Sequence, residues 1–342
     1  MIRCIEERSD GIRVYEMEND DLKVIVTSYG VTLMEIDMKD KDGSLENVIL
    51  GYPGVEDYMA KSGTYFGALV GRTCNRLAKG AFRLNGKDYS LAINNGPNNL
   101  HGGLEGFSYK NFASRIVDDN TLVFTYKSAA GEEGYPGNLE LKATLQLSGN
   151  ELKISYDALS DEDTLCSLTQ HTYFNLNQNG ETVDVSDHLL QINADRHGLV
   201  DADGLCMGKF REVEGTPLDF RTPALISQGY DMEDWQVKNA FGIDHHFVLE
   251  EGSPALILSD PASGRILEVE TTSPGIQLYS GNYIEPCKGR NGRTYGQHAG
   301  LAIEPQILPD SIHVQEHPEA LLKANQPYHQ EILYRFKTAG KE

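Results

Sequence analysis

The chain has few cationic side chains for its size and no long apolar run. Its 342 residues include 30 Lys and Arg against 51 Asp and Glu, which gives a formal net charge of −21. Nucleic acids and anionic membrane surfaces are bound by clustered cations, so this balance argues against both as partners. The charge is instead compatible with a neutral or cationic small ligand.

Paired cysteine motifs are also absent. The five cysteines are Cys4, Cys74, Cys166, Cys206 and Cys287. None forms a C-x-x-C pair, and an odd, scattered set favours free thiols in a reducing compartment over disulfides or a zinc site. The N-terminal residues lack the apolar core of a signal peptide, and no stretch approaches the roughly 18 apolar residues of a membrane helix. We therefore expect a soluble, cytoplasmic protein.

Sustained helical periodicity is missing, whereas short apolar runs recur between Gly, Asn, Asp and Pro residues. The clearest hairpin signal is Asn85-Gly86, because both residues tolerate the positive φ of a type I′ turn. A second hairpin is expected at Arg115 to Tyr126. Further strands are expected within Leu22 to Met38, with a break at Gly30, and at 48–50, 66–70, 139–147, 152–156, 256–258, 266–269, 276–279, 301–303 and 332–336. This pattern predicts an all-β sandwich or barrel.

Helices are expected to be few and short, with candidates at Pro318 to Ala324 and Pro223 to Gln228. No composition shift, internal repeat or low-complexity tract marks a domain boundary. Large all-β domains can exceed 200 residues as one unit. Residues 1–342 are therefore predicted to form a single domain.

Polar side chains alternate with large apolar ones in Gln170 to Leu176, near the middle of the chain. In an extended segment, His171, Tyr173 and Asn175 share one face, and Phe174 lies on the other. Such a strand could form one edge of a polar cleft. A half-buried strand with a structural histidine explains the same pattern.

Glycine-rich loops carry a second group of polar residues. Arg72, Asn75 and Arg76 lie in one loop, and His101 lies in another, beyond the Asn85-Gly86 hairpin. Loops of this kind allow close approach to a ligand, although turn asparagines also satisfy their own backbone.

Two later segments carry ionisable groups. Adjacent His245 and His246 follow Asp244, but consecutive strand residues point apart, and the spacing does not indicate a metal site. Glu304 ends a short apolar run, where a carboxylate is costly unless it is paired or used. A solvent-exposed strand end would explain Glu304 equally well.

Six motifs in order resemble the aldose 1-epimerases, also called galactose mutarotases. The similarity extends from the N-terminal strands to beyond Glu304. The motifs are Gly71-Arg72-x-x-Asn75-Arg76, Asn98-Asn99-Leu100-His101-Gly102-Gly103, Gly131-Glu132-Glu133-Gly134-Tyr135-Pro136-Gly137, His171-Thr172-Tyr173-Phe174-Asn175-Leu176, Asp244-His245-x-Phe247 and Gly275-Ile276-Gln277-x-Tyr279-x-Gly281-Asn282.

The resemblance implies a large antiparallel β-sandwich of the galactose-mutarotase type, with a cleft across one sheet. It implies interconversion of the α and β anomers of aldoses such as D-galactose and D-glucose, without metal or organic cofactor, by a monomer or homodimer. By resemblance, His171 is the general acid and Glu304 the general base. The sugar-binding positions implied are Asn75, Arg76, His101, Tyr173, Asp244 and Gln277. Pro305 departs from the threonine that follows the glutamate in relatives, and it removes a backbone donor there.

Three other functions stay open from the sequence. A carbohydrate-binding module would share the cleft and lack catalysis. A glycoside hydrolase would pair Glu304 with Asp244 or Glu133. An epimerase of phosphorylated hexoses would need cations near the cleft, for which the candidates are Arg72, Lys79 and Lys110. The preferred sugar, the charge state of His171 and the role of residues 283–298 are also open.

Overall fold

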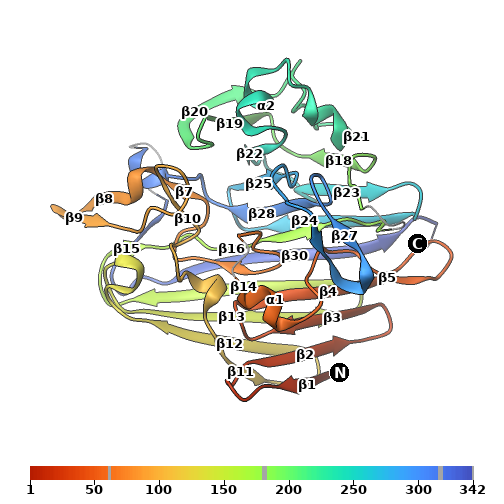
Figure 1. The fold of residues 1–342 in the computed structure, drawn as a ribbon, viewed down its shortest axis with the longest axis horizontal. Coiled ribbons are helices and arrows are strands. Elements are labelled where there is room, and N and C mark those ends of the chain that lie inside the picture. Colours follow the sequence, from red (N-terminus) through yellow and green to blue (C-terminus); the bar gives the residue numbers. More distant parts are fainter. Residues whose placement is uncertain (61–62, 179–182, 315–318, 341–342) are drawn as a thin grey trace.

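The computed structural model describes residues 1–60, 63–178, 183–314 and 319–340, and its antiparallel strands dominate the fold (Figure 1). The largest sheet has nine strands in spatial order. They are β11 (Ala113–Ile116), β12 (Thr121–Ser128), β13 (Leu139–Ser148), β14 (Glu151–Ser160), β30 (Tyr328–Thr338), β24 (Arg265–Thr271), β23 (Leu256–Asp260), β18 (Leu189–Ile192) and β21 (Ala224–Leu225).

A six-stranded sheet carries the polar segments singled out in the sequence. Its strands are β17 (Thr172–Phe174), β28 (Leu301–Gln306), β25 (Gly275–Tyr279), β22 (Asp244–Val248), β19 (Arg196–Val200) and β20 (Cys206–Glu212). A third sheet comprises β1 (Ile2–Glu7), β2 (Arg13–Glu18), β3 (Leu22–Thr27), β4 (Thr32–Lys39) and β5 (Leu45–Asn47). Neighbouring strands in all three sheets pair antiparallel.

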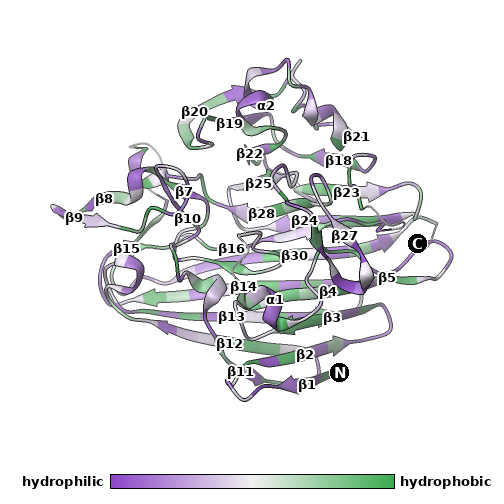
Figure 2. Cartoon of the chain, viewed as in Figure 1, coloured by the Kyte–Doolittle hydropathy of each residue, from purple (hydrophilic) through white to green (hydrophobic). Residues whose placement is uncertain are grey.

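The main core lies between the nine-stranded and six-stranded sheets. Strand β13 alternates buried and outward-facing residues along its length, as period-2 patterning requires. From the six-stranded sheet, the fully buried Phe174 packs edge-on against Tyr334 of β30, with ring centroids 5.1 Å apart. Figure 2 shows hydrophobic residues interspersed with hydrophilic ones along the strands, for example in β24. The predicted all-β sandwich is thus confirmed.

The two predicted hairpins are present. Strands β8 (Ala81–Leu84) and β9 (Lys87–Ser90) flank Asn85 and Gly86, whose φ values are 50° and 78°. Two positive φ angles are what a type I′ turn requires. The second hairpin joins β11 and β12.

Several predicted elements differ from the structure. The segment from Pro223 forms β21 and a 3₁₀ turn at Ile226–Tyr230, because its few residues cannot sustain a helix. The candidate helix at Pro318 begins outside the described residues, and its described part contains β29 (Leu321–Leu322), which pairs with β15 (Thr164–Leu165).

Two predicted strands are shorter than expected. Residues 48–50 contribute an isolated bridge from Ile49 to Phe174. Within 66–70, the structure forms β6 (Leu69–Val70), paired with β16 (Thr169–Gln170).

Two short α-helices, α1 (Val55–Met59) and α2 (Trp235–Ala240), were not predicted. Asp234 caps α2, since its carboxylate accepts from the backbone N–H groups of Gln236 and Val237. Two further strand pairs border the cleft described below, β7 (Arg76–Leu77) with β10 (Asn99–Leu100), and β26 (Cys287–Lys288) with β27 (Thr294–Tyr295). No helix among the described residues is long and apolar enough to cross a membrane.

Candidate active site

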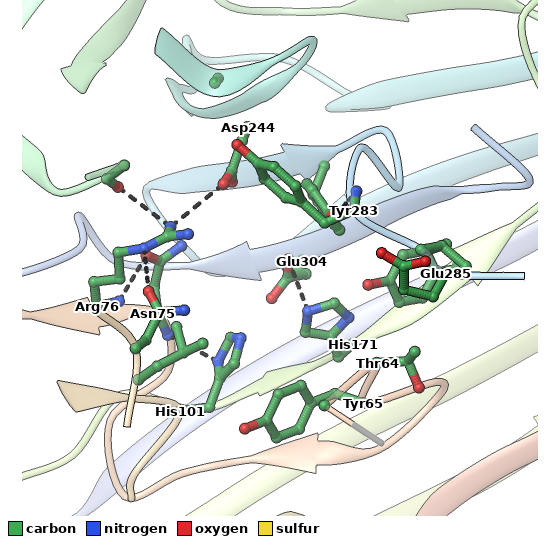
Figure 3. Close-up of a pocket in the computed structure, with 18 of the residues that line it drawn as sticks. Thr64, Tyr65, Asn75, Arg76, His101, His171, Asp244, Tyr283, Glu285 and Glu304 are labelled. Atoms are coloured by element: carbon green, nitrogen blue, oxygen red, sulfur yellow. Dashed lines mark hydrogen bonds and ion pairs between the residues drawn. The ribbon is translucent and has the colours of Figure 1, made fainter. Parts of the chain in front are cut away.

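A cleft of about 530 Å³ opens over the six-stranded sheet and brings most of the expected site residues together. Of the residues implied by the resemblance, Asn75, Arg76, His101, His171, Tyr173, Asp244 and Glu304 line it. Figure 3 shows His171 and Glu304 side by side, with Arg76 and Asp244 to one side and Glu285 to the other.

His171 and Glu304 face each other because β17 pairs directly with β28. The antiparallel register pairs Thr172 with Ile303. Because Thr172 follows His171 and Ile303 precedes Glu304, the two ionisable residues lie opposite each other. His171 Nε2 lies 3.5 Å from Glu304 Oε1, and the two side chains are only 5% and 2% exposed. Among the described residues, no hydrogen-bond partner reaches His171 Nδ1 or Glu304 Oε2. The pair therefore has two buried polar atoms without partners of their own.

Burial controls the protonation of this pair. It lowers the pKa of His171 to about 3. Burial also raises the pKa of Glu304 well above its usual value; the Asp244 carboxylate adds to this shift and the Arg76 cation opposes it. The sequence leaves the charge state of His171 open. The shifts of both pKa values follow burial, which disfavours the charged form of each group.

Asp244 is held by a cation and an amide. Arg76 Nη1 lies 3.3 Å from Asp244 Oδ2, and Gln277 Nε2 donates to Asp244 Oδ1 at 2.6 Å. Arg76 also donates to Asn95 Oδ1 at 2.9 Å and to the Gly204 carbonyl at 3.2 Å. Gln277 is absent from the described residues that line the large cleft. Gln277 therefore lies behind Asp244 and fixes its carboxylate.

His101 and Asn75 form a neutral donor pair at the cleft wall. Both have positive φ, 53° and 61°, which lets their turns approach each other closely. The Asn75 backbone N–H donates to His101 Nδ1 at 3.1 Å. Since Nδ1 accepts, the ring proton of neutral His101 resides on Nε2. Burial, with the nearby His171 and Arg76, lowers the pKa of His101 well below its usual value and keeps the ring neutral.

The central segment is only partly as predicted. His171 and Tyr173 line the cleft, and Phe174 lies in the core, as period 2 requires. Asn175 does not join them, because its side-chain amide is buried and donates to the Ala299 carbonyl at 2.8 Å and the Asp184 carbonyl at 3.0 Å. Leu176 packs in the same core cluster as Phe174, so the alternation continues, but Asn175 is absent from the described residues that line the cleft.

The cleft also contains aromatic residues that the sequence did not assign. Tyr65, Tyr279 and Tyr283 line it, and Tyr283 is 56% exposed at its rim. Their positions come from three separate loops or strand ends, and the only sequence signal is the abundance of tyrosine. The start of the 283–298 segment, including Glu285, forms part of the wall.

The cations considered for an epimerase of phosphorylated hexoses lie outside the cleft, and so does one of the two carboxylates considered for a hydrolase, whereas the other, Asp244, lines it. Arg72 is buried and donates to the carbonyls of Ser128 and Pro136 at 2.9 and 2.8 Å. Lys110 pairs with Glu132 at 3.1 Å. Among the described lining residues, neither of these cations appears, and Lys79 is also missing.

The proposed carboxylate partner Glu133 is engaged away from the cleft. It accepts from the backbone N–H groups of Leu104 and Glu105 at 3.0 and 2.9 Å.

Pro305 lies within β28 opposite Ile276, and its carbonyl accepts from Gln330 Nε2 at 2.8 Å. The strand carrying Glu304 is thus regular at the proline.

Comparisons with known proteins agree with this geometry. A family model described as aldose 1-epimerase matches residues 13–335. A galactose mutarotase of Mus musculus is 39% identical over 96% of this chain and 95% of its own length. An aldose 1-epimerase of Haemophilus influenzae is 35% identical, with 94% of each chain covered.

Solved structures show the same similarity. A GalM/aldose epimerase homologue from C. elegans superposes with a TM-score of 0.88 at 29% identity, covering 94% of this chain and 98% of its own. A galactose 1-epimerase from Lactobacillus acidophilus NCFM has a TM-score of 0.87 at 30% identity, covering 99% and 98%.

Proposed function

The chain belongs to the aldose 1-epimerase family and is an isomerase, and we propose that it interconverts the α and β anomers of D-galactose- or D-glucose-type aldoses. The observation that carries this proposal is the buried His171–Glu304 pair at the base of a hydrogen-bonding cleft. A purely structural pair would be expected to satisfy its own polar atoms, because unpaired buried groups are costly.

The reaction requires one base and one acid on the same sugar. Glu304 takes the proton of the C1 hydroxyl while His171 protonates the ring oxygen, and the C1–O bond breaks to give the open-chain aldehyde. Rotation about C1–C2 and closure on the other face give the second anomer. In the reverse step the two groups exchange roles. Ring opening in this sense starts from the imidazolium–carboxylate pair, which is the minor form in a buried site, and ends at the neutral pair that burial favours and from which ring closure starts.

The other cleft residues suit a polyhydroxylated ligand. Arg76 and His101 supply donors, and Asp244 supplies an acceptor whose orientation Gln277 fixes. Directional hydrogen bonds of this kind discriminate sugar epimers more strongly than apolar contact does. We assign Asn75 to the turn that orients His101, and Tyr173 to the wall beside His171.

The proposal extends to the whole chain and to its cofactor requirement. The family match covers residues 13–335, which supports one domain over residues 1–342. The mechanism uses two side chains and no added group, so we propose cofactor-independent turnover.

Polarimetry of freshly dissolved α-D-galactose tests the proposal. Enzyme should accelerate the approach to the equilibrium rotation, with rates then compared for glucose, maltose and a pentose. A binding module would bind sugar and leave the rate at its spontaneous value. A hydrolase would release reducing sugar from a galactoside and would likewise contradict the proposal.

A further inference from the structure

The imidazole of His171 lacks the hydrogen bond that ordinarily fixes a catalytic histidine. Such rings usually donate Nδ1–H to a carbonyl or carboxylate, which selects one tautomer and one orientation. Here no described residue provides a partner for Nδ1, and the 3.5 Å separation from Glu304 is long for a hydrogen bond. Packing against neighbouring side chains therefore contributes to holding the ring.

Three aromatic rings surround it. The Tyr65 ring lies 5.9 Å from the His171 ring at an interplanar angle of 30°, and the Tyr173 ring lies 4.9 Å away at 32°. The His101 ring meets it edge-on at 5.2 Å. Tyr65 also contacts His101, at 4.6 Å. These separations are within the range of favourable aromatic contacts, so Tyr65 touches both imidazoles of the cleft (Figure 3).

The backbone of Tyr65 is held in a costly conformation next to His171. Its φ is 55°, in the left-handed region that bulky residues avoid. The turn it begins is clamped to His171, whose N–H donates to the Ala68 carbonyl and whose carbonyl accepts from the Gly67 N–H, both at 2.8 Å. Backbone strain of this kind persists where the surrounding contacts hold the residue in place, and strained residues are concentrated at functional sites.

The Tyr65 ring is also packed on a second side. It lies 5.8 Å from the ring of Tyr109, which ends a 3₁₀ turn at Phe107–Tyr109. Tyr65 is therefore held by its backbone turn and by the packing of its ring, which lies against His171.

We propose that Tyr65 is a positioning residue that holds the His171 imidazole in one orientation for proton transfer. The proposal rests on the acid role proposed for His171. Packing of the Tyr65 ring orients the imidazole in place of a hydrogen bond to Nδ1. Misplacement of a reacting group by about 1 Å can cost on the order of 10²-fold in rate. Loss of the Tyr65 ring should therefore lower kcat more than it changes KM.

Two variants at this position separate positioning from stability. Tyr65→Asn removes the ring and keeps a residue that tolerates positive φ, so the turn should survive. Tyr65→Phe keeps the ring and loses the hydroxyl. The matched control is Tyr89→Leu, which removes a ring stacked on Phe82 in the β8–β9 hairpin, outside the cleft.

The measurements are kcat and KM by polarimetry, and the ¹⁵N spectrum of the His171 ring, identified by its loss in His171→Asn. We expect Tyr65→Asn to lower kcat about 10- to 100-fold, with KM within about threefold, and to shift or broaden the His171 ring signals because the ring is no longer held in one orientation. Tyr65→Phe should restore both readouts, and Tyr89→Leu should change neither. Folded Tyr65→Asn protein with wild-type kcat, or with an unchanged ring spectrum, would overturn the proposal.

The spectrum keeps this inference distinct from the proposed function. If His171→Asn turns over normally, the acid role fails, whatever Tyr65 does. If His171→Asn is inactive while Tyr65→Asn keeps the wild-type ring spectrum and rate, only the positioning role fails.

Discussion

Replacing Glu304 by glutamine should make the protein more stable while removing its activity. The Glu304 carboxyl is 2% exposed, and burial raises its pKa well above the usual value. A carboxyl whose pKa is raised on folding binds its proton more tightly in the folded state. Stability is then fully present below the unfolded pKa of about 4.3 and is lost as pH rises through the folded pKa. Glutamine has the same shape and no charge, so it escapes this loss.

The magnitude follows from the cost of the buried group. A buried polar group left without a partner costs about 1–3 kcal/mol. Unfolding entropy near the midpoint is about 0.7 kcal/mol/K for a chain of this length. We therefore expect Glu304→Gln to raise Tm by about 1–4 °C at pH 7.5, and to change it little near pH 4.

Thermal unfolding followed by circular dichroism at both pH values is the assay. The control is Glu212→Gln, the same substitution at an exposed residue of β20. A Tm for Glu304→Gln that is unchanged or lowered at pH 7.5, or a gain that is larger near pH 4, would refute the reasoning.

Other predictions concern binding and turn geometry. Arg76→Ala and Asp244→Ala should each raise KM for galactose at least about 10-fold with kcat changed much less, since each removes a charged hydrogen-bonding group worth about 1.5–3 kcal/mol; a kcat loss at constant KM would contradict a binding role. Gln277→Leu should raise KM by a smaller factor, because it frees Asp244 without removing it, and equal KM values in steady-state assays would count against that role. Gly86→Ala should lower the free energy of unfolding by about 1 kcal/mol and leave turnover unchanged. A Cβ at this position meets no atom within 4 Å, so the only strain comes from its positive φ. An unchanged midpoint in denaturant titrations would contradict this.

Local patterns in the sequence were enough to predict about half of the strands, but they missed others such as β1, β2, β18, β19 and β20. The alternation in β13 and the Asn85-Gly86 dipeptide are short-range signals that depend on neighbouring residues alone. The helix α2 has a capping residue, Asp234, yet its six residues are too few to show helical periodicity. Strand period also could not tell where the cleft ends, and the Asn175 side chain is used inside the fold instead of lining the cleft.

The pairing of His171 with Glu304 was expected through family resemblance rather than from pattern. These residues are far apart in the sequence, and only the register of β17 against β28 brings them together. The position of Tyr65 depends on a left-handed backbone conformation that no propensity for tyrosine predicts. Gln277 illustrates the remaining limit, because strand period does not tell whether a side chain reaches the cleft or supports the residue that does.

The most direct test of the account compares wild type, Glu304→Gln and His171→Asn by polarimetry with freshly dissolved α-D-galactose. Wild type should speed the change in rotation well beyond the spontaneous rate. Each variant should lose about 10²–10⁴-fold in kcat with a modest change in KM. Near-normal mutarotation by either folded variant would contradict the central claim that this buried pair carries the proton transfers.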